Sequence, residues 1–420
     1  MNKITNDNMT EVDVKRQVLI IGGGASGLTA AIAAAREGAE VTILEHMDRV
    51  GKKILSTGNG RCNLTNLDMR EECYRSSQKQ FPMQVLGQFS VRDTLAFFDE
   101  IGIITKNKGG YLYPNSEQAS SVLDALRLET EHLGVRVVTS CQVRKIRKTG
   151  RQDFLAETDQ GTFAGQRLIL ACGSKAAPVT GSDGSGYVLA KSIGHHVIQP
   201  LPALVQLRCE GRHFKQLAGI RCEAALRLEA DGKVAAREEG ELQLTDYGIS
   251  GIPTFQISRY ASVALAEGKR VSVLIDFLPA KDLEETRHWI RQRAKQLGYR
   301  SCGDFLTGVI NKKLAGVLLK LSGITLDTPV SQVKPAVWER LVKQLKQFEA
   351  VVTETNSFEQ AQICCGGVDT REVRPESLES KLVPGLYLVG ELLDVDGICG
   401  GYNLQWAWST GMLAGSSAAK

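Results

Sequence analysis

The sequence predicts an α/β protein in which a β-rich domain, itself carrying a small helical domain, is inserted into an α/β domain. Three observations support this prediction. Apolar segments alternate with amphipathic helical patterns over residues 15–196. Segments within 197–279 instead alternate apolar and polar residues, as half-buried strands do, and we assign 347–361 to the same domain. Helical periodicity occupies 280–346, and apolar strands return over 362–420, so the C-terminal segment is expected to rejoin the first domain.

The first α/β unit is the most sharply defined element. Residues 17–21 form a short apolar run that ends at Gly22, residues 25–37 are rich in Ala and Leu and end at Gly38, and 40–45 form a second strand. Together they make one βαβ unit. Other helices are expected at 91–102, 120–134, 283–297, 302–321 and 335–348, and other strands at 135–139, 167–171, 224–228, 240–244, 270–277 and 385–389.

The turn inside this unit carries the motif G-x-G-x-x-G. Gly22 permits the tight turn, Gly24 lets the backbone approach a pyrophosphate, and Gly27 lets helix and strand pack closely. The helix start offers free N–H groups and partial positive charge to the phosphates. Glu45 ends the second strand, where a carboxylate accepts hydrogen bonds from a ribose. The sequence therefore predicts a Rossmann-type dinucleotide site, which on this motif alone could serve NAD or FAD.

Two further segments favour FAD. A glycine-rich polar loop over 56–66 follows the second strand and can place backbone donors beside a ribityl chain and flavin ring. Near the C-terminus, the 385–389 strand ends in Gly390 and Glu391, a carboxylate suited to the ribityl-phosphate, a role that Asp394 or Asp396 could share. The glycine-rich turn that follows opens a helix whose N–H groups can face the flavin edge where charge gathers on reduction.

Taken together, residues 51–66, 181–187, 245–251, 366–368 and 385–415 resemble the BaiN/YhiN-type flavoproteins, also described as aminoacetone-oxidase-like FAD-binding enzymes. The resemblance covers about residues 17–414. It implies the three-domain layout, noncovalent FAD, and one of two activities: NAD(P)H-dependent reduction of conjugated double bonds in 3-oxo bile acids, or oxidation of small amino ketones by oxygen. Cys364 and Cys365 stand where this family's pattern has Thr-Ala, a departure that bears on substrate preference.

The residues expected at the site fall into two groups. Candidates for substrate contact or proton donation are Tyr247 and Tyr402, both in glycine-flanked loops. The residues expected to bind FAD are Gly22, Gly24, Ala25, Ser26, Gly27, Glu45, Lys53, Thr57, Gly58, Asn59, Gly60, Arg61, Cys62, Asn63, Val143, Ala171, Gly173, Gly390, Glu391, Gly401, Tyr402, Asn403 and Leu404. Since no second dinucleotide motif occurs, NAD(P)H is expected to visit the flavin transiently.

Composition and cysteine usage restrict the remaining possibilities. A net charge of +4 on 420 residues gives no reason to expect nucleic acid or an anionic membrane as the main partner. Residues 1–16 lack the apolar stretch of a signal or anchor and are expected to be a frayed tail, and no apolar run reaches the roughly 20 residues of a membrane span. Ten cysteines without a C-x-x-C pair argue against a zinc site and disulfides, so we expect a cytoplasmic monomer or homodimer without metal.

Three functions stay open at this point. The first is a reductase in which FAD takes hydride from NAD(P)H and passes it to an enone carbon. The second is an oxidase of small amines or amino ketones that produces hydrogen peroxide. The third is a flavin-binding regulatory protein or an accessory to RNA modification. Thiol catalysis is disfavoured because Cys62 has no second cysteine within a few residues, and a Cys364–Cys365 disulfide would be strained.

Overall fold

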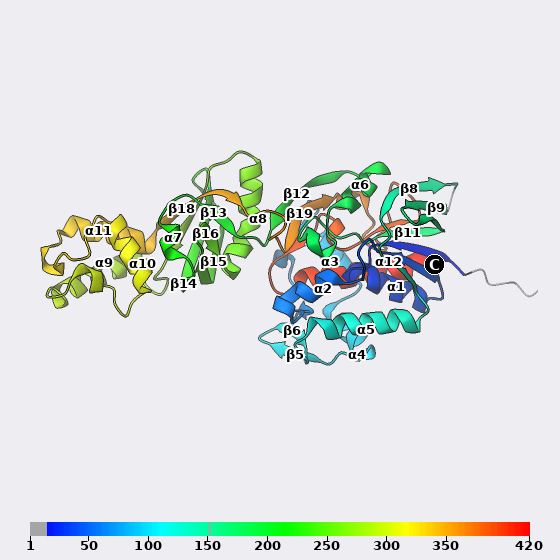
Figure 1. Cartoon of the computed structure of the whole chain (residues 1–420), viewed down its shortest axis with the longest axis horizontal. Helices are drawn as coiled ribbons and strands as arrows, with labels where there is room; N and C mark the ends of the chain where they lie inside the picture. Colours follow the sequence, from blue (N-terminus) through cyan, green and yellow to red (C-terminus); the bar gives the residue numbers. More distant parts are fainter. Residues whose placement is uncertain (1–14, 151–152) are drawn as a thin grey trace, which may run out of the picture.

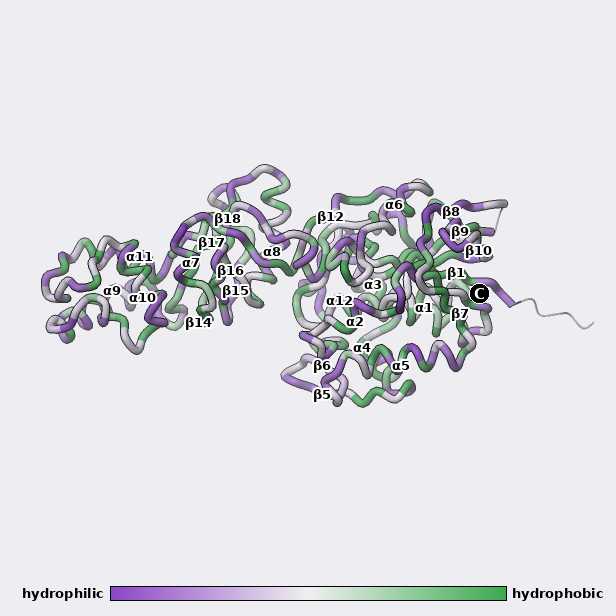
Figure 2. Tube along the Cα trace, viewed as in Figure 1, coloured by the Kyte–Doolittle hydropathy of each residue, from purple (hydrophilic) through white to green (hydrophobic). Residues whose placement is uncertain are grey.

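The computed structural model describes residues 15–150 and 153–420, so the expected N-terminal tail lies almost wholly outside the described residues. The molecule is elongated (Figure 1): the α/β domain occupies one end, a β-barrel the middle and a helical region the other end. Apolar segments gather around β1 and α1 at the centre of the α/β domain (Figure 2). None of the described helices is both long enough and apolar enough to cross a membrane.

A five-stranded parallel sheet forms the centre of the α/β domain, in the order β20-β11-β1-β2-β7. Its strands are β1 (Gln17–Ile21), β2 (Glu40–Leu44), β7 (Arg136–Val138), β11 (Arg167–Leu170) and β20 (Leu386–Leu388). Ile20 pairs with Ile43 on one side and with Ile169 on the other, and all three side chains are fully buried. The continuous apolar strands that the sequence predicts therefore form a sheet covered on both faces.

Two helices from opposite ends of the chain pack together against this sheet: α1 (Ala25–Arg36) and α12 (Tyr402–Ala419). A Cβ at Gly411 would lie 2.1 Å from Thr29 Oγ1, and one at Gly415 would lie 2.2 Å from Ala30 O. The glycines of α12 and the alanines of α1 thus allow a very close approach. The C-terminal segment, with β20 in the sheet and α12 on α1, therefore packs against the Rossmann-type fold.

Shorter elements surround the central sheet. They are α2 (Lys52–Ser56), β3 (Thr65–Asn66), β4 (Tyr74–Arg75), α3 (Phe81–Leu86), α4 (Val91–Glu100), β5 (Thr105–Lys108), β6 (Tyr111–Pro114), α5 (Ala119–His132), β8 (Val143–Thr149), β9 (Asp153–Thr158), β10 (Gly161–Gly165), α6 (Ser185–Ser192) and β21 (Asp396–Gly397). Helix α4 begins at a capping box in which Ser90 and Asp93 exchange hydrogen bonds.

The inserted β region is a closed six-stranded barrel in the order β13-β16-β15-β14-β17-β18. Its strands are β13 (Leu207–Cys209), β14 (Arg221–Ala230), β15 (Lys233–Leu244), β16 (Gly248–Ser250), β17 (Val271–Asp276) and β18 (Phe348–Thr355). Alternate residues such as Leu226, Leu228 and Val273 form a core separate from that of the α/β domain. Two helices, α7 (Phe214–Leu217) and α8 (Ile252–Ala266), belong to the same region.

The helical region connects β17 to β18 and contains α9 (Leu283–Gln296), α10 (Lys312–Leu321) and α11 (Pro335–Lys346). The prediction of a continuous helix over 302–321 is wrong for the first half of that range. A short 3-10 turn covers Cys302–Asp304, Gly308 has φ of 80°, and the Asn311 side chain caps α10 by accepting from Lys313 N. A left-handed residue and a cap both interrupt a helix, so α10 begins at residue 312.

The junction between the barrel and the α/β domain is a two-stranded antiparallel sheet of β12 (Val197–Ala203) and β19 (Ile363–Val368). Helix α8 packs beside it, where Ser262 Oγ donates to Pro202 O. Arg259 on α8 makes a two-bond ion pair with the buried Asp396, at 2.7 and 2.9 Å. The barrel is therefore held to the α/β domain by a specific polar contact as well as by packing.

Candidate functional site

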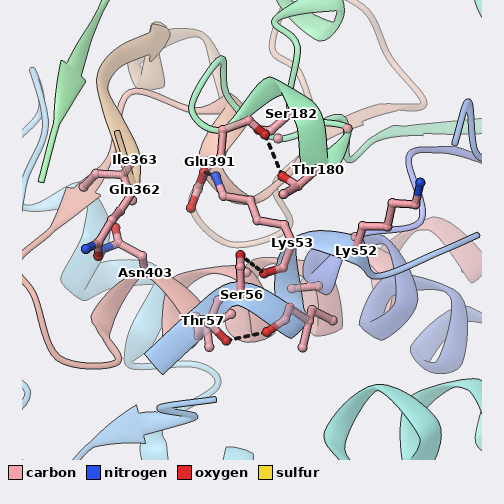
Figure 3. A pocket seen from close by; sticks show the side chains of 18 of the residues that line it. Lys52, Lys53, Ser56, Thr57, Thr180, Ser182, Gln362, Ile363, Glu391 and Asn403 are labelled. Carbon is pink, nitrogen blue, oxygen red and sulfur yellow. Dashed lines mark hydrogen bonds and ion pairs between the residues drawn. The ribbon is translucent and has the colours of Figure 1, made fainter. Parts of the chain in front are cut away.

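A cavity of about 570 Å³ opens beside the carboxyl ends of β1, β2 and β11 and continues towards α8. In open parallel α/β sheets, ligands bind at this edge. Figure 3 shows side chains from α2, from the segment before α6, and from the region following β20 converging on this cavity. The cavity thus joins segments from both ends of the chain and from the barrel.

The glycine-rich turn has the geometry that its motif predicts. Gly22 has φ of 103°, and a Cβ there would lie 2.4 Å from Ala171 O. A Cβ at Gly27 would lie 1.9 Å from Gly22 O, so helix and strand touch at this position. A Cβ at Gly24, in contrast, would have no neighbouring atom within 4 Å, and this glycine is the uncapped N-terminus of α1. The open space in front of unpaired N–H groups fits a pyrophosphate.

Glu45 has a structural task in addition to the expected ribose contact. Its two carboxylate oxygens accept hydrogen bonds from Gly23 N at 2.7 Å and from Met47 N at 2.8 Å. The side chain is largely buried yet lines the cavity. Because a carboxylate offers about four acceptor positions, it can fix the turn and still accept from a ribose hydroxyl.

The polar loop after α2 contributes an unsatisfied amide. Asn63 lines the cavity, and its Oδ1 is buried without a hydrogen-bond partner among the described residues. Leaving a buried acceptor unpaired costs about 1–3 kcal/mol. A donor such as the N–H of a flavin ring would satisfy it. Asn63 therefore supports the expected fit of the loop to a bound cofactor.

Lys53 and Glu391 meet inside the cavity (Figure 3). Lys53 Nζ lies 2.6 Å from Glu391 Oε2, and Ser174 Oγ donates to the same oxygen at 2.9 Å. Both charged side chains are mostly buried. The pair links the loop after the second strand to the C-terminal strand, the two segments that the sequence predicts to hold the ribityl chain.

The start of α12 forms the other end of the expected FAD-binding region, which we call the FAD cradle. Gly401 has φ of 97°, and no side chain caps the helix. Asn403 fixes the preceding turn: its Oδ1 accepts from Gly397 N at 2.8 Å, and its Nδ2 donates to Gly397 O at 3.0 Å. The helix N-terminus therefore faces the cavity with unpaired N–H groups and partial positive charge.

Most of the residues predicted to bind FAD line this cavity. They are Gly22, Gly24, Ala25, Ser26, Glu45, Lys53, Thr57, Gly58, Asn59, Arg61, Asn63, Val143, Ala171, Gly173, Glu391, Gly401, Asn403 and Leu404. Gly27, Gly60, Cys62, Gly390 and Tyr402 do not line it. Gly27 and Gly390 act through packing instead, since a Cβ at Gly390 would lie 2.6 Å from Ser26 Oγ.

The structure brings neither candidate tyrosine into the cavity. The Tyr247 hydroxyl lies in the barrel and accepts from Asn356 Nδ2 at 3.1 Å. Tyr402 turns its ring towards Tyr74, with the ring centroids 5.8 Å apart, and burial raises its pKa. Two other tyrosines, Tyr111 and Tyr113 of β6, line the cavity in their place.

The cysteines do not form a redox pair. Burial raises the pKa of Cys62 to about 12, so this thiol stays protonated at neutral pH. Cys364 packs with Ala176 and Val205, whereas Cys365 packs with Ala203 and Leu204 in a different cluster. All ten cysteines are free. Within the described ranges, no group of three or more His, Cys, Asp or Glu side chains could hold a metal ion.

Sequence reasoning missed part of the lining. The lining residues that were not predicted include Arg49, Lys52, Ser56, Tyr111, Tyr113, Thr180, Ser182, Leu204, Ile252, Phe255, Gln360, Gln362 and Ile363. Thr180 and Ser182 lie in or beside the glycine-rich segment 181–187, which was a usable signal. Lys52 and Ser56 lie within the segment 51–66, which was also a usable signal. Tyr111 and Tyr113 lie on β6, and several others come from the barrel and its junction, where no local pattern marks them.

Four features together define an FAD-binding oxidoreductase site. They are the Rossmann-type sheet, the uncapped start of α1, the Asn63 Oδ1 without a hydrogen-bond partner among the described residues, and the uncapped start of α12. The chain belongs to the family described as HI0933-like protein Rossmann domain, which it matches over residues 16–417. The resemblance to BaiN-type flavoproteins and the flavin-dependent enzyme class are thereby confirmed.

The chain is similar to three proteins, two in sequence and one in structure. It is 49% identical over 403 residues to the 3-dehydro-bile acid delta(4,6)-reductase of Clostridium scindens, with 96% of this chain and 98% of that protein covered. It is 30% identical over 398 residues to the ribosomal RNA dihydrouridine synthase of Haemophilus influenzae, with 93% and 96% covered. A solved 3-ketosteroid-delta4-(5alpha)-dehydrogenase of Rhodococcus jostii is 16% identical, with 98% of each chain covered and a TM-score of 0.49.

Proposed function

We propose that this protein reduces carbon–carbon double bonds conjugated to the ketone of 3-oxo steroid or bile-acid-like substrates, using NAD(P)H. The observation that carries the proposal is the 49% identity to a 3-dehydro-bile acid delta(4,6)-reductase along nearly the whole of both chains. A cavity that extends past the cofactor cradle to apolar side chains supports it. The ten free cysteines support a reducing, cytoplasmic location. We keep monomer or homodimer as the expected assembly.

The proposed reaction adds hydride to the β-carbon of the enone and a proton to its α-carbon, while NAD(P)H becomes NAD(P)⁺. Bound FAD would act as the hydride carrier between NAD(P)H and the enone. The chain's own part is to hold the reactants and to stabilise charge on the ketone oxygen. Tyr113 is our candidate proton donor, because it lines the cavity and a phenol is protonated at neutral pH.

Stopped-flow mixing under nitrogen tests the proposal. Holoenzyme is mixed with NADH or NADPH, and the absorbance of the oxidised flavin is followed. We expect rapid bleaching, followed by recovery of the absorbance when a 3-oxo-4-ene steroid is added. Bleaching by an amine or amino ketone instead, with peroxide formed in air, would establish the oxidase alternative and refute the reductase.

A second candidate function is the reduction of uridine in RNA. Two relatives that are 30% identical over 93% of this chain are ribosomal RNA dihydrouridine synthases, and dihydrouridine formation also saturates a double bond conjugated to a carbonyl. Residues 280–346 contain thirteen Lys and Arg against six Asp and Glu, although the whole chain carries only +4. Such a basic region favours contact with phosphates. Nucleoside mass spectrometry of ribosomal RNA incubated with holoenzyme and NADPH tests this candidate, which requires the appearance of dihydrouridine.

A further inference from the structure

The cavity has an apolar side beyond the residues that fit FAD. Leu204, Ile252, Phe255 and Ile363 line it there, and we call these four residues the α8 wall. Leu204, Phe255 and Ile363 belong to a small apolar cluster at the junction of β12, β19 and α8, separate from both domain cores. Ile252, the first residue of α8, is 63% exposed. A large apolar side chain left open at the edge of a cavity is available to a ligand.

The backbone at Leu204 gives a second, independent indication. Leu204 has φ of 47°, a left-handed conformation that is costly for a leucine. It is nevertheless buried, and the chain on either side is fixed, since Gln362 N donates to Leu204 O and Val205 N donates to Ser258 Oγ. Strained residues of this kind concentrate at ligand-binding positions. Leu204 is one of the residues that line the cavity.

The α8 wall is rigidly connected to the FAD cradle. Gln256 Oε1 accepts from Cys399 N at 2.8 Å, and Arg259 is paired with Asp396, which precedes the turn that opens α12. The wall therefore stands at a fixed place relative to the start of α12. A ligand on this wall would therefore be held at a fixed position relative to a flavin ring bound at that turn.

The chemistry of the wall limits what it can recognise. Its four side chains are aliphatic or aromatic, and the adjoining polar residues that also line the cavity are the amides Gln360 and Gln362 and one carboxylate, Glu359. Such a surface suits a flat fused-ring hydrocarbon with one or two ketone oxygens, and its four side chains offer no cation for a nucleotide phosphate.

We propose that the α8 wall is the subsite that binds the apolar ring system of the enone substrate, with Leu204 and Ile252 as specificity-determining residues. The inference rests on the proposed reductase function and assigns its substrate class to a particular surface. In an RNA reductase, the same wall would contact the single ring of a uracil, which is smaller than a fused steroid ring system.

The main test is the variant Ile252→Asp. Helix α8 has no acidic residue in its first turn, so an aspartate at its start favours the helix and leaves folding intact. The matched control is Val234→Asp on β15, which also replaces an exposed apolar residue of the barrel, 48% exposed, away from the cavity. The probe is 4-androstene-3,17-dione. Its dissociation constant is measured from the difference spectrum of the oxidised flavin without NADPH, and its KM is measured from turnover with saturating NADPH.

We expect Ile252→Asp to raise the dissociation constant and KM at least about tenfold, with kcat, bound FAD and Tm close to wild type. Val234→Asp should resemble wild type in all of these. Leu204→Gly should also raise KM; glycine tolerates the left-handed backbone, but the loss of a buried side chain should lower Tm, so Ile252→Asp is the variant that separates steroid binding from folding. Unchanged steroid binding in Ile252→Asp and Leu204→Gly, beside an active wild type, would overturn the subsite. A wild type that neither binds nor reduces the steroid would overturn the proposed function itself.

Discussion

Lys53 and Glu391 are 338 positions apart in the sequence, and their charged atoms lie 2.6 Å apart inside the cavity. Their side chains retain only 24% and 19% of their exposure. The pair therefore links the loop after the second strand to the last strand of the sheet. The strength of this ion pair depends on how far solvent screens the two charges, and the coupling energy between them can be measured.

We predict a coupling of about 1 kcal/mol between Lys53 and Glu391 in the free energy of unfolding of the apoprotein. A double-mutant cycle with Lys53→Met and Glu391→Gln, followed by urea denaturation, measures it. The control cycle uses Arg221→Met and Glu241→Gln, a pair with 62% and 58% exposure, for which we expect about 0–0.5 kcal/mol. Equal couplings in the two cycles would show that the cavity does not shield the pair.

Gly24 and Gly27 should respond differently to alanine. A Cβ at Gly24 meets open space, so Gly24→Ala should fold normally but weaken FAD binding at least about tenfold by occupying the phosphate region. A Cβ at Gly27 meets Gly22 O at 1.9 Å, so Gly27→Ala should destabilise the apoprotein by about 1–3 kcal/mol or more. Thermal unfolding of apoprotein and FAD titration separate the two effects. Normal FAD affinity in Gly24→Ala would contradict the pyrophosphate assignment.

Asn63→Leu should separate stability from cofactor binding. Because Oδ1 of Asn63 has no hydrogen-bond partner within the described structure, its loss should leave the apoprotein as stable as wild type or more so. FAD affinity should fall by about 10–100-fold if a flavin donor satisfies this oxygen, equivalent to about 1–3 kcal/mol. Apoprotein Tm and the FAD dissociation constant are the two measurements. A large loss of Tm would instead indicate that the amide supports the fold.

His195 should make stability dependent on pH. Burial lowers its pKa, and hydrogen bonding to Glu372 offsets part of this effect. Since the pKa is lower in the folded state than the ordinary 6.5, the neutral ring stabilises the fold above pH 6.5, and this contribution is lost as the pH falls towards the folded pKa. Urea denaturation at a series of pH values from slightly alkaline to mildly acidic should show this decline, and His195→Gln should flatten it.

The sequence was sufficient to predict the parts of the site that depend on local pattern. The first βαβ unit, Gly22, Gly24 and Glu45 follow from apolar periodicity and a short motif, and the structure places all three residues at the cavity. The return of the C-terminal helix could also be predicted, because strand and helix signals reappear after residue 362.

The far side of the cavity could not be predicted in this way. Leu204 and Phe255 reach it only because α8 packs against β12 and β19, an arrangement between domains that no local periodicity encodes. Tyr402 was expected at the site from its place in a helix-opening turn. The turn is anchored by Asn403, and the neighbouring Tyr402 ring points the other way, towards Tyr74.

The docking of α12 on α1 also sets an order of events during synthesis. Helix α12 is made after the other described helices, and its N-terminus is one wall of the cavity. A chain still attached to the ribosome would present its phosphate-binding turn long before that wall exists. Stable capture of FAD should therefore be a late event that follows the synthesis of α12.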